Sequence, residues 1–369
     1  MSDVVICLNE ALLNQLLKPE YFAGERDMVR YHADVAPYFI LPEEDTEQQH
    51  FAIRLEAFTV TVSRLATETF ELTLNGQFHF IENHILITFE QAHVTGGGRI
   101  TRTLLNMYLN KVIIPAIKEQ IALPDLRQLI GFPVTVDEVS THNRMLFMTM
   151  HVSDNQQQPT IIIKHTDEPS IFLAATGSAL TQSQHDFSIK QGIDQDTNLP
   201  LGLSLGIAQF HLVGYMEASD LQINIKRSAP ICHVNFTASA GMRVKFNHIG
   251  TLNLALSPTI TPPAISLDLQ INRAGTCLLA AMQVNSDAII GWRIPRIPMP
   301  IRLLTDEIMS WVDVSMGVVI DTIDTGLRAL SIPVFSLESF SESIGLPLRF
   351  QSVGFRGNSI VVHVQVCLL

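Results

Sequence analysis

The segment IGFPVTVDEV at residues 130–139 recurs in altered form as IGLPLRFQSV at residues 344–353. The likeness runs without a gap over residues 130–152 and 344–366, and most apolar positions match in character. The positions that are identical in the second copy are Ile130, Gly131, Pro133, Val139 and Val152. The Gly-x-Pro element predicts a rigid turn into a strand. A repeat at this distance is too long for a solenoid and indicates two related domains.

A long helical pattern precedes each copy. The first is RITRTLLNMYLNKVIIPAIKEQI (99–121), in which Pro115 should kink the helix or end its first segment. Its apolar stripe consists of Leu105, Tyr108, Leu109, Val112 and Ala116. The second pattern covers residues 303–330 and has apolar residues at helical steps of three and four. This stripe consists of Leu304, Ile308, Val312, Met316, Val319, Ile323, Leu327 and Leu330. The opposite face carries acids, which predict a solvated surface: Asp313, Asp321 and Asp324.

Most of the remaining chain predicts strands. The segment TFELTLNGQFHF (69–80) alternates apolar and polar side chains, as is typical of an antiparallel sheet with one buried face. The most apolar stretch, NLPLGLSLGIAQFHLVGYM (198–216), also alternates at its start. It therefore predicts a strand and not a membrane-spanning helix, and no integral membrane segment is expected.

The two halves of the sequence predict the same order of elements. Residues 4–17 and 170–183 both indicate a short strand followed by a helix, and the polar segment SDNQQQP (153–159) separates the halves. We therefore expect an N-terminal module at residues 1–160 and a C-terminal module at 161–369. The predicted fold class is α+β: a tandem duplication of a module in which antiparallel strands accompany one long helix.

This arrangement resembles the tubular lipid-binding (TULIP) superfamily, which includes bactericidal/permeability-increasing proteins and accessory proteins of bacterial toxin gene clusters. The likeness rests on two segments that run from long helix through Leu-Pro or Ile-Pro to the Gly-x-Pro turn, at residues 103–134 and 320–353. The resemblance implies an elongated fold in which a highly curved antiparallel sheet wraps around a long helix. It also implies binding of a lipid in the seam between them. The paired cysteines and the cationic tip of the secreted members have no counterpart in this sequence.

Composition excludes some partners. The chain has 369 residues, 47% of them hydrophobic and 16% charged, and a formal net charge of −12. Lys and Arg residues are scattered, so neither nucleic acid nor a permanent contact with an anionic membrane surface is expected. The four cysteines show neither paired nor zinc-site spacing, which predicts reduced thiols. No signal peptide is visible, so we expect a cytoplasmic protein; the alternatives are a removed signal or another export route.

Catalytic motifs are missing. The sequence has no G-x-S-x-G, H-E-x-x-H or P-loop pattern, so we expect no enzyme, no cofactor and no metal. Two segments leave alternatives open. TGGGRIT (95–101) could cradle an anionic headgroup or serve as a hinge before the helix. RIPRIPMPIR (293–302) could be an extended connection or a surface that docks a partner.

The leading hypothesis is binding, and transfer, of a lipid or another hydrophobic small molecule in the apolar seams. The alternative is a non-enzymatic scaffold with filled cores that binds a protein partner, such as an accessory protein of a toxin or secretion assembly. Helix residues that face the sheet would contact the ligand. These candidates are Leu105, Tyr108, Val112, Val312, Met316, Val319 and Ile323.

Overall fold

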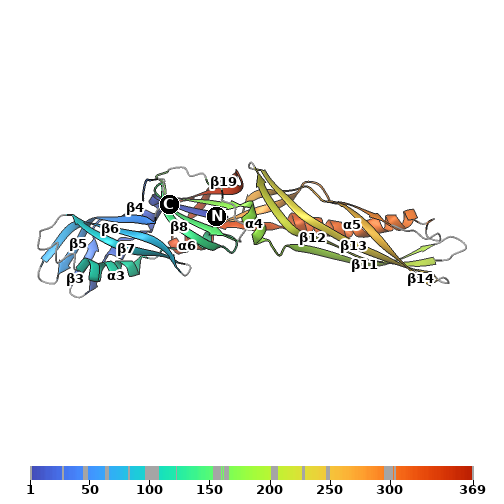
Figure 1. Cartoon of the computed structure of the whole chain (residues 1–369), viewed down its shortest axis with the longest axis horizontal. Coiled ribbons are helices and arrows are strands. Elements are labelled where there is room, and N and C mark those ends of the chain that lie inside the picture. The colour runs from blue at the N-terminus through green and yellow to red at the C-terminus, as the bar shows by residue number, and fades with distance from the viewer. Residues whose placement is uncertain are drawn as a thin grey trace. The chain divides into compact units, whose positions relative to one another are not determined.

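The structure, a computed structural model, describes residues 2–26, 29–44, 49–62, 66–81, 84–95, 108–121, 123–152, 159, 161, 166–200, 207–226, 229–246, 250–294, 302 and 305–367. The chain forms two compact units, coloured by residue number in Figure 1. Unit 1 contains Met1–Ala179, Ile271–Leu279 and Pro333–Leu369. Unit 2 contains Leu180–Gln270 and Ala280–Ile332.

A six-stranded antiparallel sheet in unit 1 joins strands from both ends of the sequence. Its order is β19-β20-β10-β1-β9-β8. The strands are β1 (Val4–Asn9), β8 (Thr135–His142), β9 (Met145–His151), β10 (Ser170–Thr176), β19 (Leu348–Arg356) and β20 (Ser359–Val366). The two central strands pair directly, with Ile6 opposite Leu173, and both side chains are fully buried. We therefore call this the shared sheet.

The repeated segments form the two ends of the shared sheet. Residues 130–152 contain the hairpin β8–β9, and residues 344–366 contain the hairpin β19–β20. Each hairpin lies beside a strand that leads into a short helix: α1 (Glu10–Leu16) follows β1, and α4 (Gly177–Ser183) follows β10. The predicted strand–helix starts at 4–17 and 170–183 are thus confirmed.

The compact units differ from the predicted division at residue 160. The reason is the shared sheet, because pairing of β1 with β10 and of β10 with β20 unites strands from both sequence halves. Residues 333–369 consequently belong to unit 1, although they lie in the predicted C-terminal module. The boundary between two duplicated modules stays a prediction.

A second sheet completes unit 1. Its path is β2-β3-β5-β6-β7, and β4 pairs with β5. The strands are β2 (Gly24–Arg26), β3 (Val29–Ala33), β4 (Tyr38–Ile40), β5 (His50–Val62), β6 (Ala66–Ile81) and β7 (His84–Thr95). Its buried face is aromatic: the rings of Phe51 and Phe78 lie 4.4 Å apart, and Phe39 contacts both. The 3-10 turns η1 (Pro19–Phe22) and η3 (Leu126–Leu129) connect elements of this unit.

The first predicted long helix is described only over its C-terminal part. Here the chain forms a π-helical turn, η2 (Leu109–Ile113), followed by α3 (Ile114–Gln120). Pro115 follows directly after the π-helical turn, within a stretch of continuous helical backbone. The π-helical turn before it is an irregularity of the kind expected where a proline kinks a helix or ends its first segment. The part of the predicted helix that precedes Tyr108, residues 99–107, lies outside the described residues.

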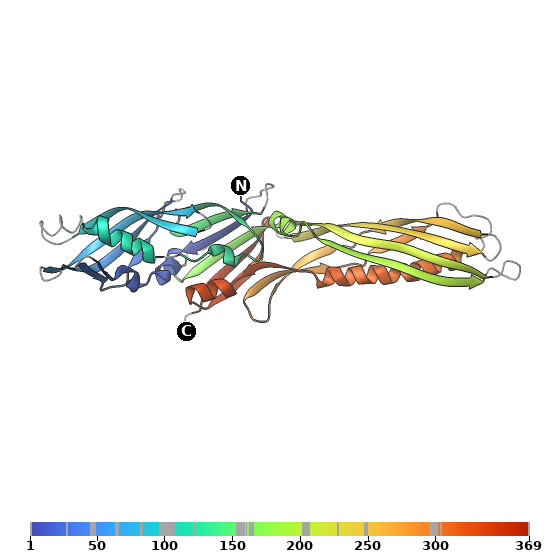
Figure 2. The same cartoon turned by 90° about the horizontal axis from the view of Figure 1, so that it is seen from below.

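Unit 2 is built from long strands that curl beside one long helix. The sheet follows the path β11-β12-β13-β15-β16-β18, with β14 paired to β13 and β17 to β14. The strands are β11 (Ser188–Pro200), β12 (Ile207–Lys226), β13 (Ala229–Phe246), β14 (Gly250–Thr261), β15 (Ile265–Ile271), β16 (Cys277–Val284), β17 (Ile289–Arg293) and β18 (Ser331–Ser336). Most of their residues belong to unit 2, whereas the start of β16 and residues 333–336 of β18 belong to unit 1. The helix α5 (Thr305–Ala329) runs alongside them (Figure 2), and α6 (Glu338–Ile344) follows in unit 1.

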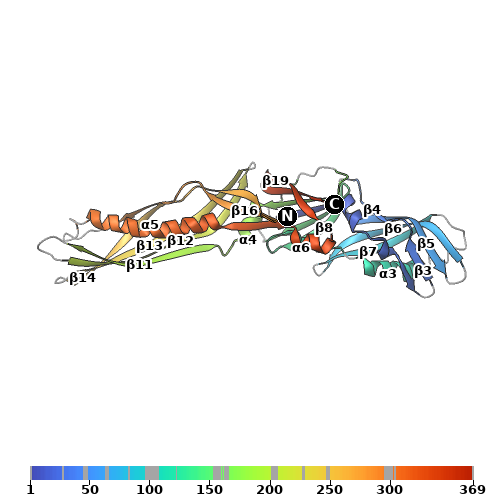
Figure 3. The same ribbon diagram turned by 180° about the vertical axis from the view of Figure 1, so that it is seen from behind.

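The fold is mostly β, with curled half-barrel sheets and few helices (Figures 1 and 3). Buried and exposed side chains alternate along β12, because successive residues of a strand point to opposite faces. The apolar stretch 198–216 falls on β11 and β12, and its described parts are strands as expected. Within the described residues, no helix has the length and apolar character that crossing a membrane requires.

Candidate functional site

Helix α5 presents an apolar face to the interior of unit 2. It packs against β11, β12 and β17. Acidic residues in its first turn and Arg328 in its last turn have the signs that the helix dipole favours. Its fully or almost fully buried apolar residues are Ile308, Val312, Met316, Val319, Ile323 and Leu327. From Ile308 to Leu327 the predicted stripe is therefore the buried face of α5. Leu304 lies outside the described residues, and Leu330 follows the helix and is half-buried.

The buried interior of unit 2 contains methionines from several elements. Three strands and α5 each supply one, and each is at most 4% exposed: Met216, Met242, Met282 and Met316. Near the middle of α5, the rings of Trp311 and Phe210 lie 6.4 Å apart in an edge-on arrangement. We call this interior between α5 and the sheet the α5 seam. Methionine side chains are flexible and polarizable, so they adapt to irregular apolar shapes.

A glycine of α5, Gly326, lies close to the sheet. A Cβ atom placed on Gly326 would lie 3.1 Å from Cδ1 of Ile189 on β11. At Gly317, which lies earlier on α5, an added Cβ atom would meet no other atom within 4 Å. The seam is thus tight at the C-terminal end of α5, where a larger residue than glycine would press on β11.

The predicted site residues fall into two groups. Val312, Met316, Val319 and Ile323 lie together on the buried face of α5, each no more than 2% exposed. In the first helical segment, Tyr108 is half-buried and precedes the π-helical turn that contains Val112. Leu105 lies outside the described residues. Contact of any of these residues with a ligand stays a prediction.

Asp324 corrects one expectation from the sequence. The helical pattern placed it on the solvated face with Asp313 and Asp321, but its side chain is buried, with the residue only 7% exposed. It accepts a hydrogen bond from the backbone N–H of Ala288, while Oδ1 has no partner among the described residues. Burial raises the pKa of this carboxyl group, and the charges of Asp287 and Asp321 raise it further, against a lowering by Arg328.

A cation stands next to this acid. The Arg328 guanidinium donates hydrogen bonds to the Asp287 carboxylate at 3.0 Å and to the carbonyl of Val284 at 3.3 Å. These contacts hold the last turn of α5 to the β16–β17 connection. The sequence pattern missed this arrangement because it depends on how α5 is rotated against that connection, which no local signal specifies.

Trp292 on β17 adds a polar atom to the apolar interior. The residue is 8% exposed, and its indole N–H has no hydrogen-bond partner among the described residues. A buried donor without a partner typically costs about 1–3 kcal/mol. The sequence analysis drew attention to Trp311 and overlooked Trp292, which lies in a short strand that packs on α5.

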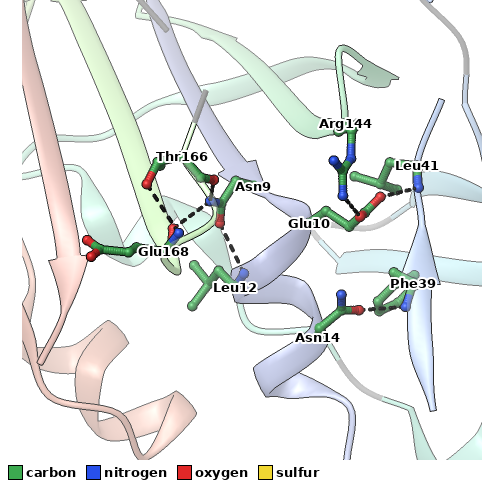
Figure 4. Close-up of polar contacts among 9 residues, drawn as sticks. All are labelled: Asn9, Glu10, Leu12, Asn14, Phe39, Leu41, Arg144, Thr166 and Glu168. Atoms are coloured by element: carbon green, nitrogen blue, oxygen red, sulfur yellow. Dashed lines mark hydrogen bonds and ion pairs between the residues drawn. The ribbon is translucent and has the colours of Figure 1, made fainter. Parts of the chain in front are cut away.

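A cavity of about 190 Å³ lies beside α1 in unit 1, and its lining includes the carboxylates of Glu10 and Asp167 and the guanidinium of Arg144. Figure 4 shows the polar contacts around α1. The Glu10 carboxylate accepts a hydrogen bond from Arg144 at 2.5 Å through Oε1 and one from the backbone N–H of Leu41 at 2.8 Å through Oε2. This hydrogen bond and the opposite charge raise the pKa of the Arg144 guanidinium. Among the described lining residues, the single cation, Arg144, is therefore already paired with a carboxylate.

The remaining contacts in Figure 4 fix α1 in place. The Asn9 side chain caps the helix by accepting a hydrogen bond from the N–H of Leu12 at 3.0 Å, and it donates to the carbonyls of Thr166 and Glu168. Asn14 accepts a hydrogen bond from the N–H of Phe39 at 2.6 Å. An N-cap hydrogen bond of this kind typically stabilises a helix by about 1 kcal/mol. We interpret this polar cluster as structural.

Among the described residues, no group of three His, Cys, Asp or Glu side chains is placed to hold a metal ion. All four cysteines are free thiols: Cys7, Cys232, Cys277 and Cys367. Burial raises the pKa of the Cys232 thiol to about 12 and that of Cys7 well above its ordinary value. Thiols in such surroundings are poor nucleophiles.

Two solved structures resemble this chain over almost its whole length. A lipopolysaccharide binding protein matches with a TM-score of 0.34 and 10% sequence identity, and the match covers 99% of each chain. P47 of Clostridium botulinum E1 matches with a TM-score of 0.41 and 8% identity, and the match covers 100% of this chain and 99% of the other. These matches agree with the resemblance stated from the sequence. At such TM-scores they carry no argument about ligand or activity.

No protein-family model and no curated protein matches the sequence. The functional conclusion therefore rests on the geometry of the α5 seam.

Proposed function

We propose that this protein binds a lipid or another hydrophobic ligand in the α5 seam of unit 2. The observation that carries the proposal is the buried face of α5, where Val312, Met316, Val319 and Ile323 meet an interior rich in methionine. Flexible methionine side chains allow a core to repack around an inserted acyl chain. The buried N–H of Trp292 supplies a hydrogen-bond donor for a polar group of the ligand.

Transfer of apolar surface from water supplies the driving force. Each buried methylene contributes about 0.8 kcal/mol. A chain of about 16 carbons would therefore gain on the order of 10 kcal/mol before the entropy of association and the cost of separating α5 from the sheet are subtracted. The net affinity depends on how much of the seam the ligand must open.

Native mass spectrometry tests the proposal. Purified protein should show a mass above that of the polypeptide, and the excess should disappear after organic extraction. The extracted compound, or a fluorescent fatty acid, should bind again to the delipidated protein. A parent protein with the mass of the polypeptide alone and no saturable uptake of the fluorescent fatty acid would refute the lipid-binding proposal.

A second function, a protein-binding scaffold, is favoured by the outer face of α5. Val314 and Val318 stand one helical turn apart and are 70% and 60% exposed. Apolar residues at such exposure on a helix are typical of surfaces that bind a partner. If the seam is a filled core, this outer face is the part of unit 2 that would carry the function, in an accessory role within a larger assembly.

Three further expectations belong to the same proposal. We propose that the protein is not an enzyme, which the poorly nucleophilic, buried thiols support. We propose a cytoplasmic location, which the four free cysteines support because reducing compartments preserve thiols. Finally, we propose a tandem duplication, supported by the equivalent places of the two hairpins in the shared sheet. An experimental structure in which residues 130–152 failed to superpose on 344–366 would remove the last of these.

A further inference from the structure

A cavity of about 250 Å³ lies on the shared sheet of unit 1, whereas the α5 seam belongs to unit 2. Three adjacent strands, β19, β20 and β10, form its floor and walls. Its side-chain lining comprises Phe172, Ser352, Arg356, Val361 and His363, together with the backbone at Gly354. We call it the Gly354 cavity.

The register of the three strands explains why the hollow lies there. Ser352 pairs with His363, which pairs with Phe172, and in the adjacent row Gly354 pairs with Val361. Residues at these positions point to the same face of the sheet, because side chains two apart share a face. Gly354 contributes no side chain to this face of the sheet. A Cβ atom added to Gly354 would meet no other atom within 4 Å. The glycine therefore leaves open space between larger neighbours.

One wall of the cavity contains two stacked rings, one of them an imidazole. The rings of Phe172 and His363 lie nearly parallel, with an angle of 4° between them and centroids 4.6 Å apart. Phe172 also belongs to a buried cluster with Cys7 and Phe147 on the neighbouring strands, which holds the ring in position. Planar groups bind well against such aromatic stacks.

The other wall carries a positive charge. Arg356 is exposed, and within the described part of the chain no carboxylate lies within ion-pair distance of it or lines the cavity. The arginine of the cavity beside α1 differs, since Arg144 is paired with Glu10. In a chain with a net charge of −12, a guanidinium in this cavity without a carboxylate partner among the described residues favours an anion. Arginine binds carboxylates with two parallel hydrogen bonds.

We propose that the Gly354 cavity binds a small aromatic carboxylate, whose ring packs against the Phe172–His363 stack and whose carboxylate pairs with Arg356. This site is independent of lipid binding in the α5 seam. The ligand class follows from complementary charge and shape: a planar apolar body for the stack and the open space above Gly354, and one anionic group for the guanidinium.

Titrations of the full-length protein with 2-naphthoate, followed by ligand-observed NMR, test the proposal. The neutral probe 2-naphthalenemethanol is the matched control for charge. We expect saturable binding of 2-naphthoate, weakened about tenfold or more by Arg356→Gln, because a hydrogen-bonded ion pair is lost. Gly354→Leu should abolish binding by filling the open space. Arg273→Gln, which changes an exposed arginine elsewhere in unit 1, should leave binding unchanged.

The neutral probe should bind more weakly than 2-naphthoate and should not respond to Arg356→Gln. Circular dichroism and thermal melting establish that each variant is folded; if Gly354→Leu does not fold, the exposed substitution Arg356→Gln decides the question. Two results overturn the proposal: no saturable binding of 2-naphthoate by the parent, or binding that both cavity variants retain. The second result would place the probe elsewhere, including the α5 seam.

Discussion

Gly131 lies against the backbone of Pro333. A Cβ atom on Gly131 would stand 2.4 Å from the Pro333 carbonyl oxygen, and the Gly131 N–H donates a hydrogen bond to the carbonyl of Val334 at 2.9 Å. The repeated glycine has another reason in the second copy. Gly345 ends α6 with a φ of 68° and has open space around its Cα. The glycine of the repeated motif thus has a different structural role in each copy. In the first copy it allows a close backbone approach, and in the second it adopts a left-handed backbone conformation.

Alanine at these two positions should therefore destabilise the protein by different routes. Gly131→Ala forces the backbone of β18 away and should cost about 1–3 kcal/mol, as overpacking does. Gly345→Ala should cost roughly 1–2 kcal/mol through left-handed backbone strain alone. Urea unfolding monitored by circular dichroism measures both. Gly354→Ala, with open space and ordinary strand backbone, is the control and should be neutral or slightly stabilising; a Gly131→Ala variant as stable as this control would contradict the close approach.

Replacing Asp324 with Asn should change how stability depends on pH. The folded protein holds the pKa of this carboxyl group above its ordinary value of 3.8, mainly through burial. The folded state therefore binds the proton more tightly than the unfolded chain, and stability decreases as pH rises from that ordinary value through the folded pKa. Above the folded pKa the full penalty is present.

Thermal melting of parent and Asp324→Asn from acidic to neutral pH measures this dependence. The variant should lack the decrease and should melt higher than the parent at neutral pH, since it carries no buried charge. Asp313→Asn, on the exposed face of α5, is the control and should follow the parent curve. Parallel curves for the parent and the Asp324 variant would show that the carboxyl group is not perturbed.

The substitution Met316→Arg distinguishes between two hypotheses: that the α5 seam binds a ligand, or that it is a filled core. The side chain is fully buried on the inner face of α5. In a seam that opens for lipid, uptake of a fluorescent fatty acid should fall sharply. In a filled core, the unpaired buried charge should instead lower the melting temperature strongly without any lipid in the parent. Val318→Arg, on the exposed side of the same helix, is the matched control and should affect neither quantity. Unchanged uptake by Met316→Arg would remove this face of α5 from the site.

The four thiols should differ in reactivity. Cys7 and Cys232 are buried, and burial raises the pKa of both. Cys277 and Cys367 are only half-buried. Titration of the native, unreduced protein should therefore modify these two first, and titration in denaturant should count four. A count below four in denaturant would reveal a disulfide and would also weaken the proposed cytoplasmic location.

Local sequence patterns predicted the individual helices and strands better than they predicted which strands pair with one another. The step of three and four residues along 303–330 predicts α5, because the helical period is a property of the backbone itself. Alternation predicts β12 for a similar reason. The pairing of β1 with β10 could not be derived, since both strands are buried on both faces and read as continuous apolar runs.

In the candidate sites as well, the sequence predicted features within one element but not features that depend on packing between elements. The buried face of α5 followed from its sequence, including Val312 and Met316. The burial of Asp324 did not, because it depends on the packing of α5 against residues near Ala288. The Gly354 cavity unites Phe172 with residues almost two hundred positions later, and only strand register brings them together.

The shared sheet also determines when unit 1 can be completed during synthesis. β10 pairs with β20, yet the chain of unit 2 is made between them. At about 5–20 residues per second, a ribosome needs roughly 10–40 s to pass from the end of β10 to the start of β20. During that interval one edge of β10, whose side chains are all buried in the finished protein, has no partner strand. An uncovered apolar edge is a template for aggregation, so we expect that this edge of β10 needs protection, as a chaperone could give, until β20 has been synthesised.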